Sequence, residues 1–331
     1  MKEHGKHYYL FWEKTSAQSA KILRFFSNLP IADIPDQIEG YPVTELGNYC
    51  FAPECRLPDT YKIFQTNISI DSVTELCGNY VESVRLPDTL EIIGDYSFYN
   101  CRNLSHIICS GKLHTFGSDA FMNCHHLHHI FIRCAPAEKT GLRQMLAQIS
   151  WDTEVHFIGN LKPDTSDPQA VLFYPEYYEA YDEIAPAHIF GRKIIGEGFR
   201  SRQCFENNVV DFSQYDKIFP QACVEESERT LCQLAYNRLR YPYHLSETSK
   251  TQYANYIFTH GKILCRQFIQ CKQLNDLLFL FQEKLLSPQN SQFALTFAAQ
   301  TGWSEGCAGM LRQKQMQKQP KQRTKYEFDD F

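Results

Sequence analysis

The sequence predicts an α+β protein in which an N-terminal solenoid of short parallel strands precedes a mainly α-helical domain of hairpin repeats. Two observations carry this prediction. The first half of the chain repeats itself every 23 residues, and apolar residues from about residue 226 recur with the 3.6-residue period of a helix. Hydrophobic residues make up 43% of the 331 residues and charged residues 21%, so the chain has material for a large core and is not wholly disordered.

The repeat is clearest between residues 90–107 and 113–130, where five positions of the same chemical type coincide. The equivalent pairs are Gly94 and Gly117, Phe98 and Phe121, Cys101 and Cys124, Leu104 and Leu127, and Ile107 and Ile130. A Pro-Asp dipeptide in the same phase follows Ile34, Leu57 and Leu86. We therefore expect about five to six turns over residues 30–159, with one irregular turn near residues 61–83.

Each turn offers one short strand, and alternation along the strand decides which side chains enter the core. The expected strands are 84–86, 107–109, 130–132 and 155–157, and the first and third residues of each should point inward. The repeated glycines suit a tight turn that a Cβ atom would hinder, with the repeated phenylalanines packed beneath it. The repeated cysteines take inward positions at which a small residue stacks from turn to turn. Neighbouring turns therefore stabilise one another.

The pattern from Leu86 to Ile107 reads Leu-Pro-Asp-x-Leu-x-x-Ile-Gly-x-x-Ser-Phe-x-x-Cys-x-x-Leu-x-x-Ile, and the next copy has Ala in place of Ser. This pattern resembles the BspA-type leucine-rich repeat, and residues 34–47 resemble the usual first turn of such arrays in bacteria. The resemblance covers about 40% of the chain. It implies a leucine-rich-repeat solenoid in a bacterial protein.

The resemblance leaves the location open, because many members of that family are secreted or attached to the cell surface. In this sequence no charged segment followed by an apolar segment suggests a signal peptide, and no run approaches the ~18–20 apolar residues that cross a bilayer. The 13 cysteines contain no Cys-x-x-Cys pair, which favours free thiols in a reducing compartment. We expect a cytoplasmic protein that does not bind membranes.

Composition shifts divide the chain into five segments. We expect an N-terminal cap at 1–29, the repeats at 30–159, a linker and mixed segment at 160–225, a helical-repeat-like domain at 226–315 and a flexible tail at 316–331. A short amphipathic helix is expected at 138–149, within the array. The expected helices of the C-terminal domain are 226–240, 247–259, 261–271, 273–285, 289–301 and 303–315.

Local signals support the ends of these helices. Ser246 is a good N-terminal residue, the Ser287-Pro288 pair interrupts the pattern, and Gly302 ends one helix before the next. Residues 298–311 resemble the second half of an ankyrin-like repeat, although the Thr-Pro-Leu-His signature of true ankyrins is absent. Short helices joined by short connections predict stacked helical hairpins.

The outward face of the solenoid strands is the predicted binding surface. Its central residues should be Arg85, Ile108, Phe131 and His156, flanked by His106 and His129. Ile108 and Phe131 are apolar at positions that should face water, and exposed apolar patches often mark interfaces. The alternative is that the 138–149 insertion or the second domain covers this face.

A run of histidines at 125–129, interrupted by Leu127, lies beside Cys124, and both residue types are zinc ligands. Adjacent residues diverge on a turn and strand, so we expect surface histidines and no metal site. The alternative is a surface metal site that His106 and His156 of neighbouring turns would complete.

Residues 191–202 combine glycines with Arg192, Lys193, Arg200 and Arg202. Backbone amides in a glycine-rich turn together with arginines can hold a phosphate or carboxylate. The segment matches neither the Gly-x-x-x-x-Gly-Lys-Ser/Thr nor the Gly-x-Gly-x-x-Gly pattern of phosphate-binding loops. We therefore favour an ordinary basic loop, and an anion site is the alternative.

The motifs that mark common catalytic sites are missing from the sequence, including the Gly-x-Ser-x-Gly, His-Glu-x-x-His and kinase patterns. The formal net charge of −5 disfavours nucleic acid as a partner. We therefore expect a non-enzymatic protein-interaction or scaffold protein without a cofactor. The alternatives are a regulatory module that binds an anionic or phosphorylated ligand in its C-terminal half, and an enzyme of unrecognised type centred on residues 171–225.

Overall fold

The computed structural model describes residues 8–54, 56–66, 73–159, 167–184 and 189–318. The chain forms two compact units. The first contains residues 1–226 together with 241–245, and the second contains residues 227–240 and 246–331. The first is built around strands and the second is helical, so the predicted α+β class is confirmed.

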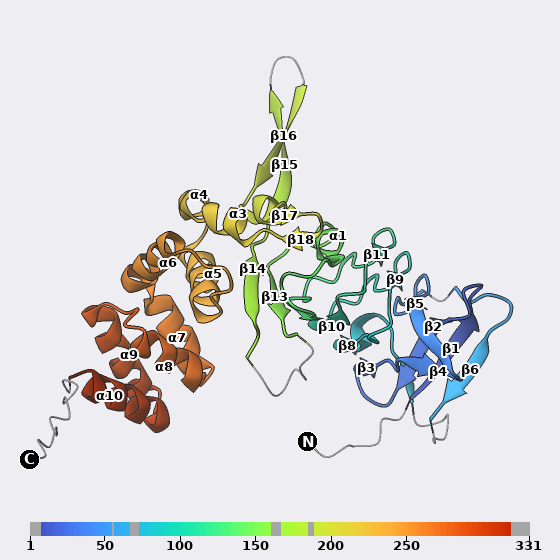
Figure 1. The fold of residues 1–331 in the computed structure, drawn as a ribbon, viewed down its shortest axis with the longest axis horizontal. Helices are drawn as coiled ribbons and strands as arrows, with labels where there is room; N and C mark the ends of the chain where they lie inside the picture. The colour runs from blue at the N-terminus through green and yellow to red at the C-terminus, as the bar shows by residue number, and fades with distance from the viewer. Residues whose placement is uncertain (1–7, 55, 67–72, 160–166, 185–188, 319–331) are drawn as a thin grey trace, which may run out of the picture. The chain divides into compact units, whose positions relative to one another are not determined.

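One parallel sheet runs through the first unit, and its strand order follows the chain from blue β3 to yellow-green β14 (Figure 1). Five strands are parallel neighbours and the sixth, β14, pairs antiparallel with β13. The strands are β3 (Ile31–Asp33), β8 (Ser83–Arg85), β10 (His106–Ser110), β12 (His129–Arg133), β13 (Thr153–Phe157) and β14 (Ala170–Tyr174). The sheet therefore extends beyond residue 159 into the segment that we expected to be a linker, of which residues 160–166 lie outside the described residues.

A second sheet covers the opposite side of the turns. Its parallel strands are β5 (Tyr41–Leu46), β9 (Ile92–Ile93) and β11 (Thr115–Phe116), and the antiparallel hairpin β1 (Tyr8–Lys14) and β2 (Ala20–Ser27) continues it. The remaining strands of this sheet are β4 (Gln37–Ile38), β6 (Lys62–Gln65) and β7 (Thr74–Glu75). Strands β6 and β7 come from the irregular turn, and they pair with β1 and β2.

The N-terminal hairpin is fastened to the first turn by one buried guanidinium. Arg24 of β2 is 2% exposed, and its Nη1 donates to the backbone oxygens of Tyr49, Cys50 and Ala52. Its Nε also lies 2.8 Å from a carboxylate oxygen of Glu75. Residues 8–27 of the predicted cap thus form part of the same sheet system as the repeats, while residues 1–7 lie outside the described residues.

The core lies between the two sheets and is built from equivalent residues of successive turns. The predicted inward residues of the strands, including Val84, Ile107, Ile130 and Val155, are completely buried. The rings of Phe51 and Phe98 stack with centroids 5.0 Å apart, and those of Phe98 and Phe121 with centroids 5.5 Å apart. Burying each such ring contributes about 1.5–3 kcal/mol.

The inward cysteines add a polar contact between turns. The Cys101 Sγ lies 3.2 Å from the backbone oxygen of Phe51, and the Cys124 Sγ lies 3.0 Å from that of Phe98. In each case the thiol donates to a carbonyl of the preceding turn. Burial raises the pKa of Cys124 to about 12, so its thiol stays protonated and keeps this hydrogen bond at neutral pH.

The repeated glycines are required by the neighbouring turn. A Cβ atom added to Gly117 would lie 2.3 Å from the backbone nitrogen of Asp95, and one added to Gly94 would lie 2.8 Å from that of Asn48. Neither glycine has a positive φ angle, so close approach between turns, rather than the conformation of one turn, explains the residue.

The rest of the first unit consists of short elements. They are η2 (Gly78–Tyr80), α1 (Leu142–Leu146), the hairpin β15 (Tyr178–Ile184) and β16 (Ile189–Ile195), α2 (Gly198–Ser201), the hairpin β17 (Phe205–Glu206) and β18 (Val209–Val210), α3 (Phe212–Lys217) and α4 (Phe219–Glu225). Helix α1 is shorter than the predicted 138–149. It starts after Gly141, and the Gln148 side chain beyond its end bonds Ala120 and Gly117 of the adjacent turn.

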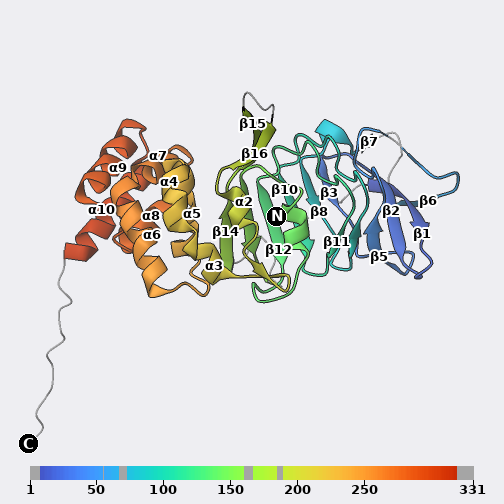
Figure 2. The same ribbon diagram turned by 90° about the horizontal axis from the view of Figure 1, so that it is seen from above.

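The second unit contains six helices within the described residues, and Figure 2 shows them packed side by side. They are α5 (Glu228–Arg240), α6 (Glu247–His260), α7 (Lys262–Gln270), α8 (Leu274–Gln282), α9 (Pro288–Gln300) and α10 (Ser304–Lys318). Each agrees with a predicted helix to within three residues. Sequence neighbours pack as pairs, α5 on α6, α7 on α8 and α9 on α10, as expected for helical hairpins.

The predicted helix signals act as expected. Ser246 and Ser287 accept hydrogen bonds from the backbone nitrogens three residues later, and Pro288 occupies the first turn of α9. Gly302 has a φ angle of +70° after α9. Helix α10 includes residues 316–318 of the predicted tail, and residues 319–331 lie outside the described residues. Among the described residues, no helix is long and apolar enough to span a membrane.

The close approach at Gly117 gives a test of the stacking between turns. We expect Gly117→Ala to destabilise the first unit by about 1–3 kcal/mol, because the new methyl group overlaps the backbone of Asp95. Urea unfolding followed by circular dichroism measures the effect. The exposed neighbour serves as the control, since Ser118→Ala should change stability by less than ~0.5 kcal/mol. Equal stability of both variants would contradict the crowding argument.

Candidate functional site

The outward side chains of the first sheet form two parallel rows, because residues in register on neighbouring strands point to the same side. We call these two rows the strand face. The first row is Ile31, Ser83, His106, His129, Glu154 and Phe173. The second row is Asp33, Arg85, Ile108, Phe131, His156 and Val171. All six residues proposed from the sequence for protein binding lie in these rows.

The centre of the strand face is apolar and aromatic. Ile108 is directly opposite Phe131, and both side chains are half-buried. The Phe131 ring stacks on the His156 imidazole, with centroids 4.6 Å apart and an interplanar angle of 23°. The His106 and His129 rings each lie 6.3 Å from the Phe131 ring. Phe131 is therefore surrounded by three imidazoles and one aliphatic side chain.

His106 is fixed in orientation by its hydroxyl neighbours. Its Nε2 lies 2.7 Å from the Ser83 Oγ, and its Nδ1 lies 2.9 Å from the Ser105 Oγ. Burial lowers the pKa of His106 below its ordinary value, because the charged imidazolium loses hydration. Both ring nitrogens are therefore occupied within the protein.

Helix α1, part of the insertion that we considered as a cover for the strand face, lies elsewhere. It packs against β11, which belongs to the second sheet. Three acid–base contacts lie within the rows themselves. The Arg85 Nη1 is 3.8 Å from an Asp33 carboxylate oxygen, and Glu154 lies between His129 and His156.

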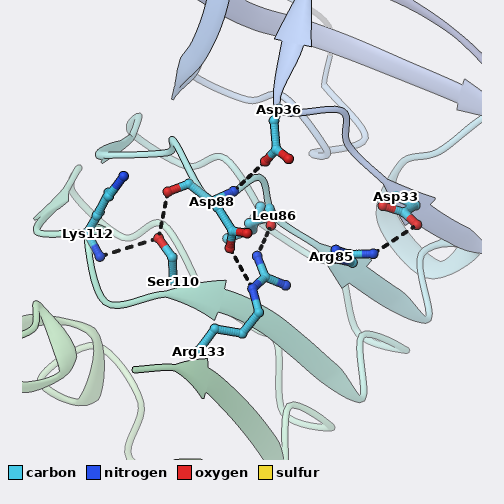
Figure 3. A network of polar contacts seen from close by, with 8 residues as sticks. All are labelled: Asp33, Asp36, Arg85, Leu86, Asp88, Ser110, Lys112 and Arg133. Carbon is cyan, nitrogen blue, oxygen red and sulfur yellow. Dashed lines mark hydrogen bonds and ion pairs between the residues drawn. The ribbon is translucent and has the colours of Figure 1, made fainter. Parts of the chain in front are cut away.

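A polar network borders the strand face where strands β8, β10 and β12 end (Figure 3). The Arg133 Nε donates to the Asp88 carboxylate over 2.6 Å, and the Arg133 Nη2 donates to the Leu86 oxygen over 2.8 Å. The Asp88 backbone nitrogen donates to the Asp36 carboxylate, and the Ser110 hydroxyl donates to the Asp88 oxygen. These contacts join four turns, those of β3, β8, β10 and β12, and restrict movement of this border.

A pocket of about 790 Å³ adjoins the network, and its lining contains both charge signs. Among the lining residues are the acids Asp88 and Glu91 and the bases Lys112, Arg133 and Lys139. Sequence reasoning missed Asp88 and Arg133 as functional candidates. The signal was available, because Arg133 follows Phe131 by two residues on the same strand and Asp88 belongs to the repeated Pro-Asp dipeptide.

The histidine run diverges as expected for residues 125–128. His125 lies edge-on against Trp151 with centroids 5.1 Å apart, and the His128 Nδ1 lies 2.7 Å from the Asp152 backbone oxygen. His129 behaves differently, because it begins β12 and lies in the first row of the strand face. Burial is the main effect that lowers the pKa of His129, and the Glu154 carboxylate opposes it.

Residues 44–141 match, in six copies, the family described as the BspA type leucine rich repeat region. These residues are a BspA-type leucine-rich repeat region. They include β8, β10 and β12, and hence the centre of the strand face.

Two further comparisons concern solved structures and curated proteins. The solved crystal structure of a leucine rich repeat protein from T. pallidum is 16% identical and covers 45% of this chain and 78% of its own, with a TM-score of 0.22. Among curated proteins, no match to this chain is found.

Beyond the leucine-rich repeat region, the basic segment does not form one cluster. Arg202 is 3% exposed, and its guanidinium donates to the backbone oxygens of Ile149, Trp151, Pro175 and Gly198. This makes Arg202 a structural residue, because its donors are directed at carbonyls of the protein. Anion binding by Arg202 stays a hypothesis, and these contacts direct its guanidinium into the protein instead.

The other three basic residues lie on the surface among carboxylates. Arg192 pairs with Glu179, and the Arg200 Nη1 lies 2.8 Å from a Glu197 carboxylate oxygen. Lys193 is exposed. Lys193 and Arg200 line one pocket of about 490 Å³, but two glutamates, Glu197 and Glu225, line it as well.

Replacing Arg202 separates its two possible roles. We expect Arg202→Lys to lower stability by about 2–4 kcal/mol, because lysine cannot reach all four carbonyls and leaves buried acceptors unpaired. Thermal unfolding with and without phosphate measures this. Lys193→Gln, at an exposed position, is the control and should stay within ~0.5 kcal/mol. Wild-type stability of Arg202→Lys together with loss of a phosphate effect would contradict the structural role.

Proposed function

We propose that this protein is a non-enzymatic scaffold that binds a protein partner through the strand face of its leucine-rich repeat region. The observation that carries the proposal is the row of Ile108, Phe131 and His156, in which an apolar and aromatic strip occupies outward positions of a parallel sheet. Extended sheet surfaces of solenoids serve as binding faces in repeat proteins generally.

The composition of the strand face suits a protein interface. Ile108 and Phe131 supply an apolar centre, and Arg85, His106 and His129 supply a polar surround. Interfaces commonly place a few aromatic anchors at the centre and polar groups at the rim. A partner that contributes an apolar side chain between Ile108 and Phe131 would complete the cover of both residues.

The rigidity of the surface favours binding as well. The strand face rests on stacked, fully buried residues, and the Arg133–Asp88 contacts tie its border across three turns. A surface that is ordered before binding loses less conformational entropy when a partner docks.

The state of two buried cysteine thiols supports a binding role over nucleophilic catalysis by these residues. The inward thiols of Cys101 and Cys124 donate to backbone carbonyls, and burial raises the pKa of both well above its ordinary value. A protonated thiol is a poor nucleophile. The free buried cysteines also suit a reducing compartment, so we further propose a cytoplasmic location.

The alternative function, a regulatory module that binds an anionic ligand through the basic segment, has less support. Its strongest remaining feature is the pocket that contains Lys193 and Arg200. Glu197 and Glu225 balance their charge there, so the pocket offers an anion little net attraction.

The test is an affinity pull-down that compares the wild type with the double variant Ile108→Asp/Phe131→Asp. We expect a specific partner of the wild type to bind the double variant at least tenfold more weakly, because two carboxylates would be desolvated at the centre of the interface. Quantitative binding of the recovered partner measures this loss.

The control is Met122→Asp, which places a carboxylate at an exposed apolar residue of the same repeat region, outside the sheet strands. All three proteins must first give the same circular dichroism spectrum and similar melting temperatures. Equal binding by the wild type and both variants would overturn the proposal and direct the search to the helical unit.

A further inference from the structure

We propose that His129, Glu154 and His156 form a binding site for a divalent transition metal ion, with Zn²⁺ as the first expectation. The site lies on two neighbouring strands, β12 and β13. It goes beyond the scaffold function and does not rest on partner binding.

The parallel register brings the three side chains together. Glu154 is directly opposite His129, and His156 follows Glu154 by two residues on the same side of the sheet. The His129 Nδ1 and the His156 Nε2 each lie 3.5 Å from the same Glu154 oxygen, Oε2. One ligand atom from each residue lies within 4.8 Å of the other two.

Two of the three separations match those expected around a tetrahedral zinc ion. With Zn–N and Zn–O bonds of about 2.0–2.2 Å, tetrahedral geometry separates ligand atoms by roughly 3.4 Å. Both contacts to Glu154 already have this length. The third separation, between the two histidine nitrogens, is at most 4.8 Å, and His129, whose side chain is 47% exposed, is the least enclosed of the three ligands.

The other two ligands are held in place before an ion arrives. The His156 and Glu154 side chains are 15% and 14% exposed. The His156 ring is stacked on Phe131. Its Nε2 is a buried nitrogen that has no hydrogen-bond partner among the described residues. Its contact with the Glu154 carboxylate is too long or too poorly aligned for a hydrogen bond, and a metal ion between the two groups would satisfy both.

Among the described residues, the group contains three ligands, and nearby side chains make other contacts. Both ring nitrogens of His106 contact serine hydroxyls, the His128 Nδ1 contacts the Asp152 oxygen, and the Cys124 thiol donates to Phe98. Three protein ligands leave a coordination position open for water or for a group from another molecule. Two imidazoles and one carboxylate favour Zn²⁺, Ni²⁺, Co²⁺ or Cu²⁺ over Mg²⁺ and Ca²⁺, which prefer oxygen ligands.

Isothermal titration of the full-length protein with ZnCl₂, after treatment with EDTA and buffer exchange, tests the site. We expect one saturable site in the wild type and a rise in melting temperature when Zn²⁺ is present. Glu154→Gln and His156→Ala should each weaken this binding at least tenfold. Glu154→Gln keeps the size of the side chain, so it remains informative if His156→Ala disturbs the packing of Phe131.

The matched control is His126→Ala, which removes an exposed histidine from the same run and should leave Zn²⁺ binding unchanged. The proposal is overturned if the wild type shows no saturable binding, or if His126→Ala abolishes the binding while Glu154→Gln and His156→Ala retain it. None of these results depends on the pull-down with Ile108→Asp/Phe131→Asp. The metal site and the scaffold function are therefore tested independently.

Discussion

The first unit depends on one constraint, the requirement that each turn place its inward groups directly against the same groups of the next turn. The stacked rings of Phe51, Phe98 and Phe121 meet this requirement in the core. The thiols of Cys101 and Cys124 meet it by adding a second donor to backbone carbonyls, of Phe51 and Phe98, that already accept a backbone N–H. A larger residue at any of these positions would push two turns apart and break several contacts at once.

The same constraint creates the strand face. Because the inward residues fix the register of neighbouring strands, the residues between them are forced into straight rows on the outer side. The outer positions have no role in stacking, so their chemistry is free to serve recognition. This is why Ile108 and Phe131 are informative, since water-facing positions give no structural reason for apolar side chains.

Features that repeat along the chain, such as strand alternation and helical period, could be predicted from the sequence. Contacts that occur once between distant residues could not. The alternation in Val84 to Leu86 and its equivalents predicted the inward residues correctly, because a strand period of two is a local property. The glycines at 94 and 117 were recognised, but the group that each Cβ would strike belongs to the neighbouring turn and has no local signature. The helices of the second unit were predicted from their period and their capping residues.

Contacts between distant residues explain what sequence reasoning missed. Arg202 looked like part of a basic surface segment, and only the fold shows that its guanidinium is enclosed by carbonyls from residues up to 53 positions away. Likewise, the predicted strands placed His129 and His156 on the same face, but Glu154, which lies between them on the next strand, precedes the predicted strand 155–157 and was missed.

Strand β14 has a consequence for how the parallel array ends. A parallel sheet that ended at β13 would present an open edge on which a second molecule could add its own strand, the usual route to filaments. Strand β14 instead runs in the opposite direction, all five of its residues are buried, and the Tyr215 hydroxyl donates to the Phe173 oxygen. Strand β14 therefore occupies the edge of β13 that a further parallel strand, from this chain or from another molecule, would need.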